Sequence, residues 1–549
     1  MSKRKTAWSL LVALLLSVLI AACGDNATST PASSSTAAGS TAAGQSATTA
    51  ASGANQAPAK RGGDLKIAIP QLPSALDPVI STLGTNWTVA ANACEGLFAL
   101  DDNWNVQPML VDSYTYDAAT PSLTFKLRQG VKFQDDSTMT ADDVVASLTR
   151  YSQSAGTGAI LKSLMKDIKA TDPNTVVLTL TQPTGTVPAL LTMTPAVIMP
   201  KKNIEGVSAS TPVQNLICTG PYKVTDFKPD QQAVLTRFDG YVSRTEPTSG
   251  SAGAKTAPAD RIIFLPQAEP STRRDSLLTG SVDVAAGLPF DFYDAIKSNS
   301  SVKPLIIKDN QSLTMVFNTK QGPTANVKLR QAIYYALDMD PIMLAAEGNP
   351  DFYSLDPSWY PFPGAAWHTN VGAENFGKAN LDKAKQLLKE SGYNGETLRW
   401  LTSKDYFNQW YLPAQTVQQQ LEKIGIKIDL QALPAATVSQ KRTDPANFEI
   451  FSSFLPAYPD PTLIPYLQST FPGFWSNQQK EDLVTKLRTE SDQTKRVEIW
   501  KQIQTLLYQE FPYIKFGTEA AFSAVGKNVT GLSTSPANTA AFYNVSPGK

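Results

Sequence analysis

The sequence has 549 residues, which is too long for one ordinary domain and predicts two or three. Its 48 basic and 48 acidic residues balance, so the basic excess typical of nucleic-acid binding is absent and no nucleic-acid partner is expected. A single histidine, His368, and three cysteines argue against structural zinc, which needs about four Cys or His ligands, and against His-dependent nucleophilic catalysis. These shortages favour binding over chemistry, with no catalytic residue, no metal and no cofactor expected.

The first 22 residues have the pattern of a secretory signal peptide. Lys3, Arg4 and Lys5 precede an apolar run from Trp8 to Ala22, which is short for a membrane span of about 20 apolar residues. The run ends in Ala21-Ala22-Cys23-Gly24, which resembles the bacterial lipobox. That resemblance implies cleavage before Cys23 and lipidation of Cys23. The alternative is an ordinary cleavage site beside an accidental cysteine.

Residues 23–61 consist almost entirely of Ser, Thr, Ala, Gly, Gln, Asn and Pro, with too little apolar bulk to fold. They are expected to form a flexible tether from a lipid anchor on the outer face of the cytoplasmic membrane, in the periplasm or at the cell surface. The folded part is then 62–549. In an exported protein Cys94 and Cys218 either pair or remain as buried free thiols, because sequence spacing gives no geometry.

Strand and helix patterns alternate along the folded part and predict an α/β protein. Apolar residues in strand-like patterns predict strands at Leu65–Ile69, Leu123–Arg128, Thr175–Leu180 and Ile426–Leu430. A polar surface loop is expected over 242–258.

Three helices carry their own end signals. Thr140 precedes Asp142 and Asp143, the arrangement of an N-cap with acidic residues in the first turn. Asn380 is expected to cap a helix that Gly392 ends. A third helix is predicted over Lys495–Gln509, with one apolar face.

Six blocks of the folded part, in order, resemble the family 5 extracellular solute-binding proteins of bacterial ABC importers, which include dipeptide-, oligopeptide- and nickel-binding proteins. The blocks are Cys94–Asp101 with Val106–Leu110, Leu123–Arg150, Thr219–Val224, Arg274–Asp283, Arg330–Asp338 and Tyr458–Pro461. Together they span about 65–545. Gln134-Asp135-Asp136 departs from the family's usual His-Asp-Gly and is expected only to change a turn.

This resemblance implies the two-lobed, periplasmic-binding-protein-like (Venus-flytrap) α/β fold, of the large type with an extra subdomain in lobe I. Lobe I is expected over 62–310, with the subdomain inserted at about 93–212, lobe II over 311–514, and a return to lobe I over 515–549. It also implies a monomer that captures a peptide or peptide-sized solute in an interlobe cleft. The cargo would pass to a membrane permease and its ATPase, without chemistry.

The resemblance also marks candidate ligand contacts. In peptide-binding members an aspartate pairs with the ammonium of the peptide, and that position is Ala457 here. Because a buried ammonium without a counter-charge is unfavourable, the departure disfavours a free-amine peptide. The family's aromatic platform, which lies just after a strand, corresponds in this sequence to about Ala435. The residues that the sequence nominates for ligand binding are Thr85, Asn86, Trp367, Arg442, Phe454, Tyr458 and Asp460.

Several alternatives stay open at this point. An oligosaccharide or an N-blocked peptide needs no carboxylate at position 457. The aromatic stretch Trp359–His368 either stacks on ligand or packs into a Pro-rich loop, and His368 either ligates a metal chelate or is a packed residue. From other classes, a cell-surface hydrolase with paired carboxylates, or a sensor protein with a membrane signalling partner, remains possible without a motif to support it.

Overall fold

The computed structural model describes residues 61–548 except 82, 155 and 539–540. The predicted signal peptide, the lipidation site Cys23 and the tether up to residue 60 lie outside the described residues. Among the helices of the described part, none is both long enough and apolar enough to cross a membrane.

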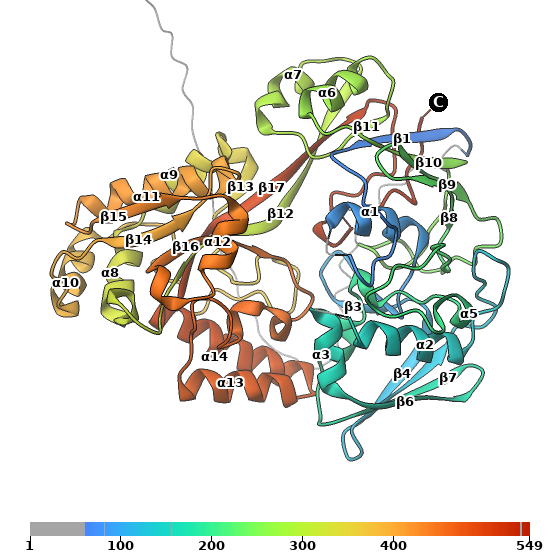
Figure 1. The fold of residues 1–549 in the computed structure, drawn as a ribbon, viewed down its shortest axis with the longest axis horizontal. Helices are drawn as coiled ribbons and strands as arrows, with labels where there is room; N and C mark the ends of the chain where they lie inside the picture. Colours follow the sequence, from blue (N-terminus) through green and yellow to red (C-terminus); the bar gives the residue numbers. More distant parts are fainter. Residues whose placement is uncertain (1–60, 82, 155, 539–540, 549) are drawn as a thin grey trace, which may run out of the picture. The chain divides into compact units, whose positions relative to one another are not determined.

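An eleven-stranded mixed sheet forms the centre of the fold (Figure 1). Its strand order is β15-β14-β16-β12-β17-β11-β1-β10-β9-β8, and β13 pairs with β17 beside this path. The strands are β1 (Asp64–Ile69), β8 (Tyr222–Lys228), β9 (Gln232–Arg237), β10 (Arg261–Pro266), β11 (Val284–Ala285), β12 (Val302–Phe317), β13 (Tyr353–Ser354), β14 (Leu398–Thr402), β15 (Ile428–Ala432), β16 (Ile450–Pro456) and β17 (Tyr513–Gly526).

The two longest strands, β12 and β17, join the two sides of this sheet. They pair antiparallel from Val302↔Gly526 to Val316↔Tyr513, with a register shift between Ile307 and Gln311. One end of β17 pairs with β11, while β12 pairs with β16. Figure 1 shows the pair running between the two groups of strands. The α/β, two-lobed fold class that the sequence predicts is confirmed, with these strands as the connection between the lobes.

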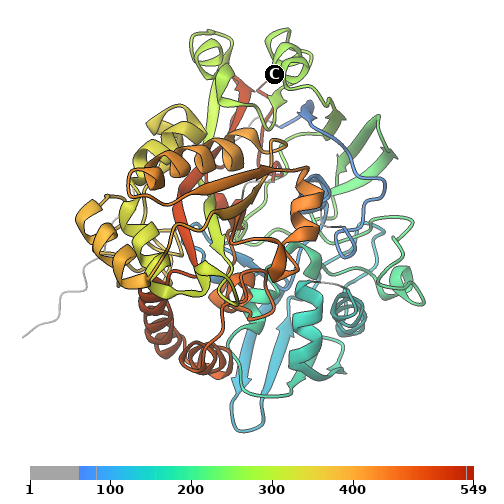
Figure 2. The ribbon, with the colours of Figure 1, turned by 60° about the vertical axis from the view of Figure 1, so that its left-hand side comes forward.

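A smaller antiparallel sheet lies within the segment predicted to be inserted in lobe I. Its order is β4-β5-β7-β6, and a separate pair is β2-β3. The strands are β2 (Phe98–Leu100), β3 (Val106–Pro108), β4 (Val111–Asp117), β5 (Ser122–Leu127), β6 (Met165–Asp172) and β7 (Thr175–Leu180). Helices α2 (Ala141–Ser152) and α3 (Thr157–Leu164) cover one face of the smaller sheet (Figure 2).

The remaining helices pack mainly around the large sheet. They are α1 (Gly84–Ala93), α4 (Val187–Leu190), α5 (Lys201–Ile204), α6 (Pro270–Leu278), α7 (Tyr293–Lys297), α8 (Val327–Ala336), α9 (Met339–Glu347), α10 (Leu381–Ser391), α11 (Leu412–Glu422), α12 (Ala435–Lys441), α13 (Gln478–Thr489) and α14 (Gln493–Glu510). One apolar core joins α8, α9 and α11 to β14 and to β12, and its largest fully buried side chain is Trp400.

The helix ends form where the sequence places their signals. Thr140 and Asp143 make a capping box at the start of α2, with the Thr140 amide donating to Asp143 Oδ2 at 2.8 Å. The Asn380 side chain accepts from the Lys383 amide, and Gly392 ends α10 in the left-handed conformation. The strand predicted at Ile426–Leu430 begins two residues later, at Ile428, and Ile426 is buried in the core just before it.

The inserted segment is fastened at its neck, where the chain leaves the large sheet and returns to it. A disulfide joins Cys94 to Cys218, which resolves the two alternatives left open for these cysteines. The Gln134 side-chain amide donates to the carbonyls of Ala93 and Tyr222, at 2.6 and 2.7 Å, and its oxygen accepts from the Cys218 amide at 3.0 Å. The expectation that the departure at Gln134 changes only a turn is therefore wrong, because the side chain ties three strand and helix ends together.

Candidate functional site

Two cavities lie where the segment before residue 260 meets the segment after residue 360. The first, of about 240 Å³, lies beside Ala457. Its wall includes Trp87, Glu95, Trp104, Lys255, Ala457, Pro459 and Tyr543. Because residues from both segments contribute to its wall, a ligand in this cavity would contact both.

A buried ion pair lies in the wall of this first cavity. Lys255 Nζ is 3.0 Å from Glu95 Oε1, and both side chains are almost fully buried. Glu95 also accepts hydrogen bonds from the Tyr241 hydroxyl at 2.8 Å and the Thr219 hydroxyl at 3.1 Å. Burial and the adjacent Glu95 raise the pKa of Tyr241, which keeps its hydroxyl protonated as a donor. The Lys255 ammonium lies 4.6 Å above the Tyr543 ring.

The charges of the first cavity therefore balance internally. Every oxygen of Glu95 already has a donor, so this carboxylate is not left to receive the ammonium of a ligand. Position 457 supplies only a methyl group. The local chemistry suits a ligand whose buried part carries no unpaired positive charge.

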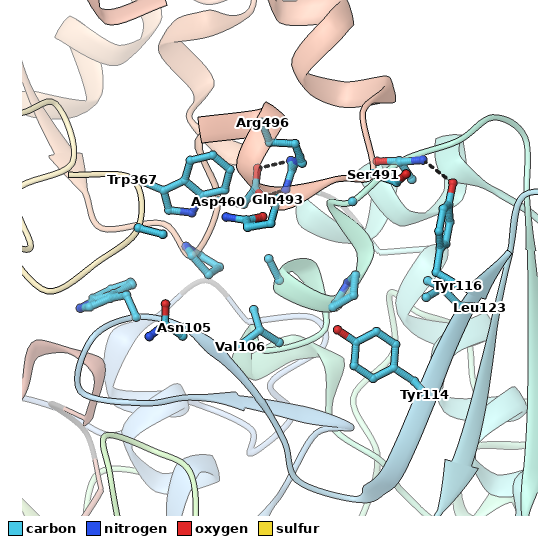
Figure 3. A pocket seen from close by; sticks show the side chains of 17 residues that line it. Asn105, Val106, Tyr114, Tyr116, Leu123, Trp367, Asp460, Ser491, Gln493 and Arg496 are labelled. Atoms are coloured by element: carbon cyan, nitrogen blue, oxygen red, sulfur yellow. Dashed lines mark hydrogen bonds and ion pairs between the residues drawn. The ribbon is translucent and has the colours of Figure 1, made fainter. Parts of the chain in front are cut away.

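The second cavity, of about 340 Å³, is shown in Figure 3. One wall is formed by β3 and by the outer residues Tyr114 and Tyr116 of β4. The facing wall contains Trp367, the Pro459-Asp460 pair and the start of α14. Trp104 and Pro459 contribute to both cavities and thus form part of the partition between them. The Trp104 ring is held by stacking on Phe362, with ring centres 4.2 Å apart.

Asp460 contributes to the second cavity through a buried ion pair with Arg496. The two oxygens of Asp460 lie 2.7 and 3.0 Å from Arg496 Nη1 and Nη2, and each side chain is 1% exposed. Asp460 also accepts from the Thr462 amide at 2.9 Å and the Thr462 hydroxyl at 2.6 Å. These contacts shape the loop after β16 and occupy the carboxylate fully.

The other nominated residues lie in different surroundings. Thr85 and Asn86 are in the first turn of α1, and the buried Asn86 amide donates to the Ala75 carbonyl at 2.8 Å. Their neighbour Trp87 is the residue that lines the first cavity. Helical periodicity could have pointed to Trp87. Trp87 and Ala91 are four residues apart on one helix face, and both line that cavity.

Three nominated residues lie near the end of β16. The Arg442 guanidinium lies 5.2 Å from the Phe451 ring centre, and burial lowers its pKa. Phe454 packs edge-on against Tyr406, with ring centres 5.2 Å apart. Tyr458 is half-buried beside Ala457, and its carbonyl accepts from the Tyr360 hydroxyl. Ala435, where the aromatic platform was expected, is the first residue of α12, and the aromatic side chains gather instead around Phe454.

The aromatic stretch before His368 is mostly packed into the protein. Trp359, Tyr360 and Trp367 are each buried, although Trp367 keeps an edge on the second cavity. His368 Nε2 lies 2.8 Å from Asp356 Oδ2. Within the part of the chain that the structure describes, no group of three or more His, Cys, Asp or Glu side chains is arranged to hold a metal ion.

Comparison with known proteins decides the family. A model of the bacterial extracellular solute-binding proteins, family 5, matches residues 105–474. The chain belongs to this family. A probable peptide ABC transporter periplasmic-binding protein of Sinorhizobium fredii is 30% identical, over 84% of this chain and 89% of that protein. The glutathione-binding protein of Escherichia coli is 27% identical, over 85% of this chain and 91% of that protein.

Solved structures of other binding proteins share the fold of this family 5 protein. The agropinic acid complex of AgaA from A. tumefacien R10 superposes with a TM-score of 0.70 at 25% identity, covering 88% of this chain and 98% of that one. The Helicobacter pylori protein DppA, in complex with the peptide STSA, gives a TM-score of 0.70 at 21% identity, covering 89% of this chain and 99% of that one. Each match covers nearly nine tenths of this chain, so the two-lobed fold is shared along most of its length.

Proposed function

We propose that this family 5 protein is the ligand-capturing component of a bacterial ABC importer. It takes up a peptide or peptide-sized solute in the cavity beside Ala457 and delivers it to a permease and ATPase complex. The observation that carries the proposal is the wall of that cavity, which combines Trp87 and Lys255 of the first segment with Ala457 and Pro459 of the second. The names of the relatives, a peptide transporter component and a glutathione-binding protein, support this solute class.

Ligand capture of this kind works by a shift between conformations. A ligand that contacts both segments stabilises the arrangement in which they are close together, since it loses half of its contacts when they separate. A permease can then favour the loaded form only through contacts that differ between the two arrangements. No bond is made or broken, so the protein does no chemistry on its cargo.

The cargo differs from a simple free-amine peptide. Of the described residues, the only charged ones that line the first cavity are Glu95 and Lys255, which neutralise each other, and position 457 offers no carboxylate. An α-ammonium buried there would lose its hydration without a counter-charge, which is unfavourable by several kcal/mol. A peptide with a blocked amino end, or a solute without an ammonium group, avoids this loss.

We also propose how the chain is exported, anchored and divided into lobes. The chain is a monomer, exported by its signal peptide and anchored through lipid on Cys23, with 23–61 as the tether. The lobes are divided at 310/311 and 514/515, which fall within β12 and β17, and the insertion spans about 93–212. The nominated ligand residues remain part of the proposal, although Asp460 and Asn86 have partners within the protein.

Thermal unfolding of residues 61–549 with a panel of solutes tests the proposal. The panel contains free-amine di- to pentapeptides, the same peptides N-acetylated, β-linked oligosaccharides and nickel chelates. A ligand that binds only the native state stabilises it by about 2.7 kcal/mol at a hundredfold excess over Kd. We expect N-acetylated peptides to raise the melting temperature more than free-amine peptides. The absence of a shift with every peptide contradicts peptide capture.

An engineered carboxylate at position 457 tests whether this position selects the ligand. Ala457→Asp places a charge where the resemblance implies that peptide-binding members carry one, and we expect affinity for free-amine dipeptides to rise about tenfold or more. Ala457→Asn is the matched control, since it has the same size without the charge and leaves the preference unchanged. If both variants bind free-amine peptides as the unmodified protein does, position 457 does not select the ligand.

A further inference from the structure

The second cavity is a built feature of the fold, because its two walls are bonded to each other at one edge. The Gly185 amide donates to the Glu490 carbonyl at 3.0 Å. The Thr186 hydroxyl lies 3.0 Å from the Thr462 hydroxyl and accepts from Arg496 Nη2 at 3.2 Å. Both threonines are buried. The space in Figure 3 is thus bounded by fixed contacts between distant segments.

The lining of this cavity has no unpaired charge to offer. Within the described part of the chain, Asp460 and Arg496 are the only charged residues that line it, and they form the buried pair described above. Arg496 Nε is directed at the Leu487 carbonyl at 3.3 Å, so the guanidinium is engaged on each of its nitrogens. A charged ligand would lose hydration here without gaining a counter-ion. The site therefore favours a neutral ligand.

Three neutral polar side chains of the lining are available to hydrogen-bond a ligand. Among the described residues, the Tyr114 hydroxyl, the Ser491 hydroxyl and the Gln493 amide make no side-chain hydrogen bond to protein. Figure 3 shows the Tyr114 hydroxyl directed into the cavity. The Tyr114 ring is held edge-on against Phe98 at 5.1 Å. Hydroxyl and amide groups of this kind donate to and accept from a ligand rich in hydroxyls.

Aromatic rings supply the apolar surface of the cavity. Trp104, Tyr116 and Trp367 line it together with Tyr114 and small apolar residues. An apolar, aromatic lining with a few convergent polar groups is typical of small-molecule sites, and the cavity volume lies within their range. Flat rings beside neutral hydrogen-bonding groups suit a molecule with one apolar face and a rim of hydroxyls.

We propose that the cavity of Figure 3 is a second binding site, for an uncharged sugar, separate from the ligand cavity beside Ala457. The exposed Tyr114 ring and the partly exposed Tyr116 ring pack against the apolar face of the sugar, and Tyr114, Ser491 and Gln493 exchange hydrogen bonds with its hydroxyls. This inference does not depend on peptide capture in the first cavity, because the two sites are tested by different ligands and different variants.

Isothermal titration calorimetry with cellobiose and maltose tests the site, with glucuronic acid and glucosamine as charged probes. We expect at least one neutral disaccharide to bind and the charged sugars to bind at least about tenfold more weakly. Ala366→Trp fills the cavity from an exposed position and abolishes this binding. Tyr114→Phe combined with Gln493→Ala weakens it about tenfold through lost hydrogen bonds.

Control variants and folding measurements show whether a loss of sugar binding arises at this cavity. Tyr406→Phe removes a hydroxyl from another tyrosine that is 41% exposed, as Tyr114 is, and leaves sugar binding unchanged. Circular dichroism and thermal melts establish that each variant is folded. The proposal is overturned if neither disaccharide binds the unmodified protein, or if Ala366→Trp binds it equally well. It is also overturned if Ala457→Trp abolishes sugar binding while Ala366→Trp does not, because the sugar then occupies the first cavity.

Discussion

At the scale of single residues, the pair Asp460–Arg496 connects three distant segments of the chain. Asp460 follows β16, Arg496 lies in the first turn of α14, and Thr186 comes from the inserted segment. A buried pair of this kind is not itself evidence of stability, since both charges have lost their hydration. Removing one partner, however, leaves the other charge buried and unpaired.

We expect Arg496→Met to lower the free energy of unfolding by about 3–5 kcal/mol, because it strands the Asp460 carboxylate. Urea denaturation followed by circular dichroism measures the loss. Asp239→Asn is the control, since it removes a side chain that is 92% exposed from its pair with Arg237, which changes the stability by less than about 1 kcal/mol. Equal effects of the two substitutions contradict the assignment.

A second residue-scale feature is the pair of buried carboxyls Glu347 and Glu519. Glu519 lies on β17, opposite Gln311 of β12. Burial raises the pKa of both groups, and the neighbouring Glu519 raises that of Glu347 further. Gln311 of β12 donates to Glu519 Oε1 at 2.5 Å. With raised pKa values in the folded state, these groups contribute stability below their unfolded pKa of about 4.3 that is lost as pH rises towards their folded values.

The free energy of unfolding should therefore fall between pH 5 and 8, with a slope of up to about 1.4 kcal/mol per pH unit for one such group. Glu347→Gln removes one titrating group and should flatten this fall. Urea denaturation at several pH values in this interval gives the slope. Glu498→Gln, at an exposed position, is expected to leave the slope unchanged. Parallel curves for Glu347→Gln and the unmodified protein would show that the pair does not titrate in this range.

At the scale of elements, the inserted segment depends on its neck. The Ala93 carbonyl at the end of α1 and the start of β8 converge on Gln134, beside the Cys94–Cys218 disulfide. The hydrogen bonds of Gln134 and the disulfide together hold a segment of more than a hundred residues in a fixed attachment. The smaller sheet can then form one wall of the second cavity.

We expect the double substitution Cys94→Ala with Cys218→Ala to lower the free energy of unfolding by about 2–4 kcal/mol, because the disulfide closes a long loop. Urea denaturation with and without reductant provides the measurement. Reductant should have no effect on the double variant and should weaken the unmodified protein. A variant as stable as the oxidised protein would mean that Gln134 and the packing around it suffice.

The elements themselves are largely predictable from sequence, because their signals are local. Thr140, Asn380 and Gly392 act through hydrogen bonds to residues within four positions, and the strand at Thr175–Leu180 follows from its own apolar residues. The cavities are not predictable in this way. Trp104 and Arg496 meet only through the tertiary fold, so the family motif that nominated Asp460 and the aromatic stretch that nominated Trp367 could not separate the two cavities.

At the scale of the whole molecule, the lobes share one sheet instead of being joined by a flexible linker. β17 pairs with β11 on one side, β12 pairs with β16 on the other, and the two long strands pair with each other. Relative motion of the lobes must then bend or twist these strands. Their pairing is already interrupted by two register shifts, between Ile307 and Gln311 and between Leu313 and Thr314.

The late position of β17 has a consequence for how the protein is made. β17 is the last strand that the structure describes, yet it pairs with β11, β12 and β13. Until synthesis reaches Gly526, the growing polypeptide exposes the unpaired edges of strands that β17 later covers. The large sheet can therefore be completed only after nearly all of the described chain is available for folding, which makes the pairing of β17 with β11 and β12 a late step.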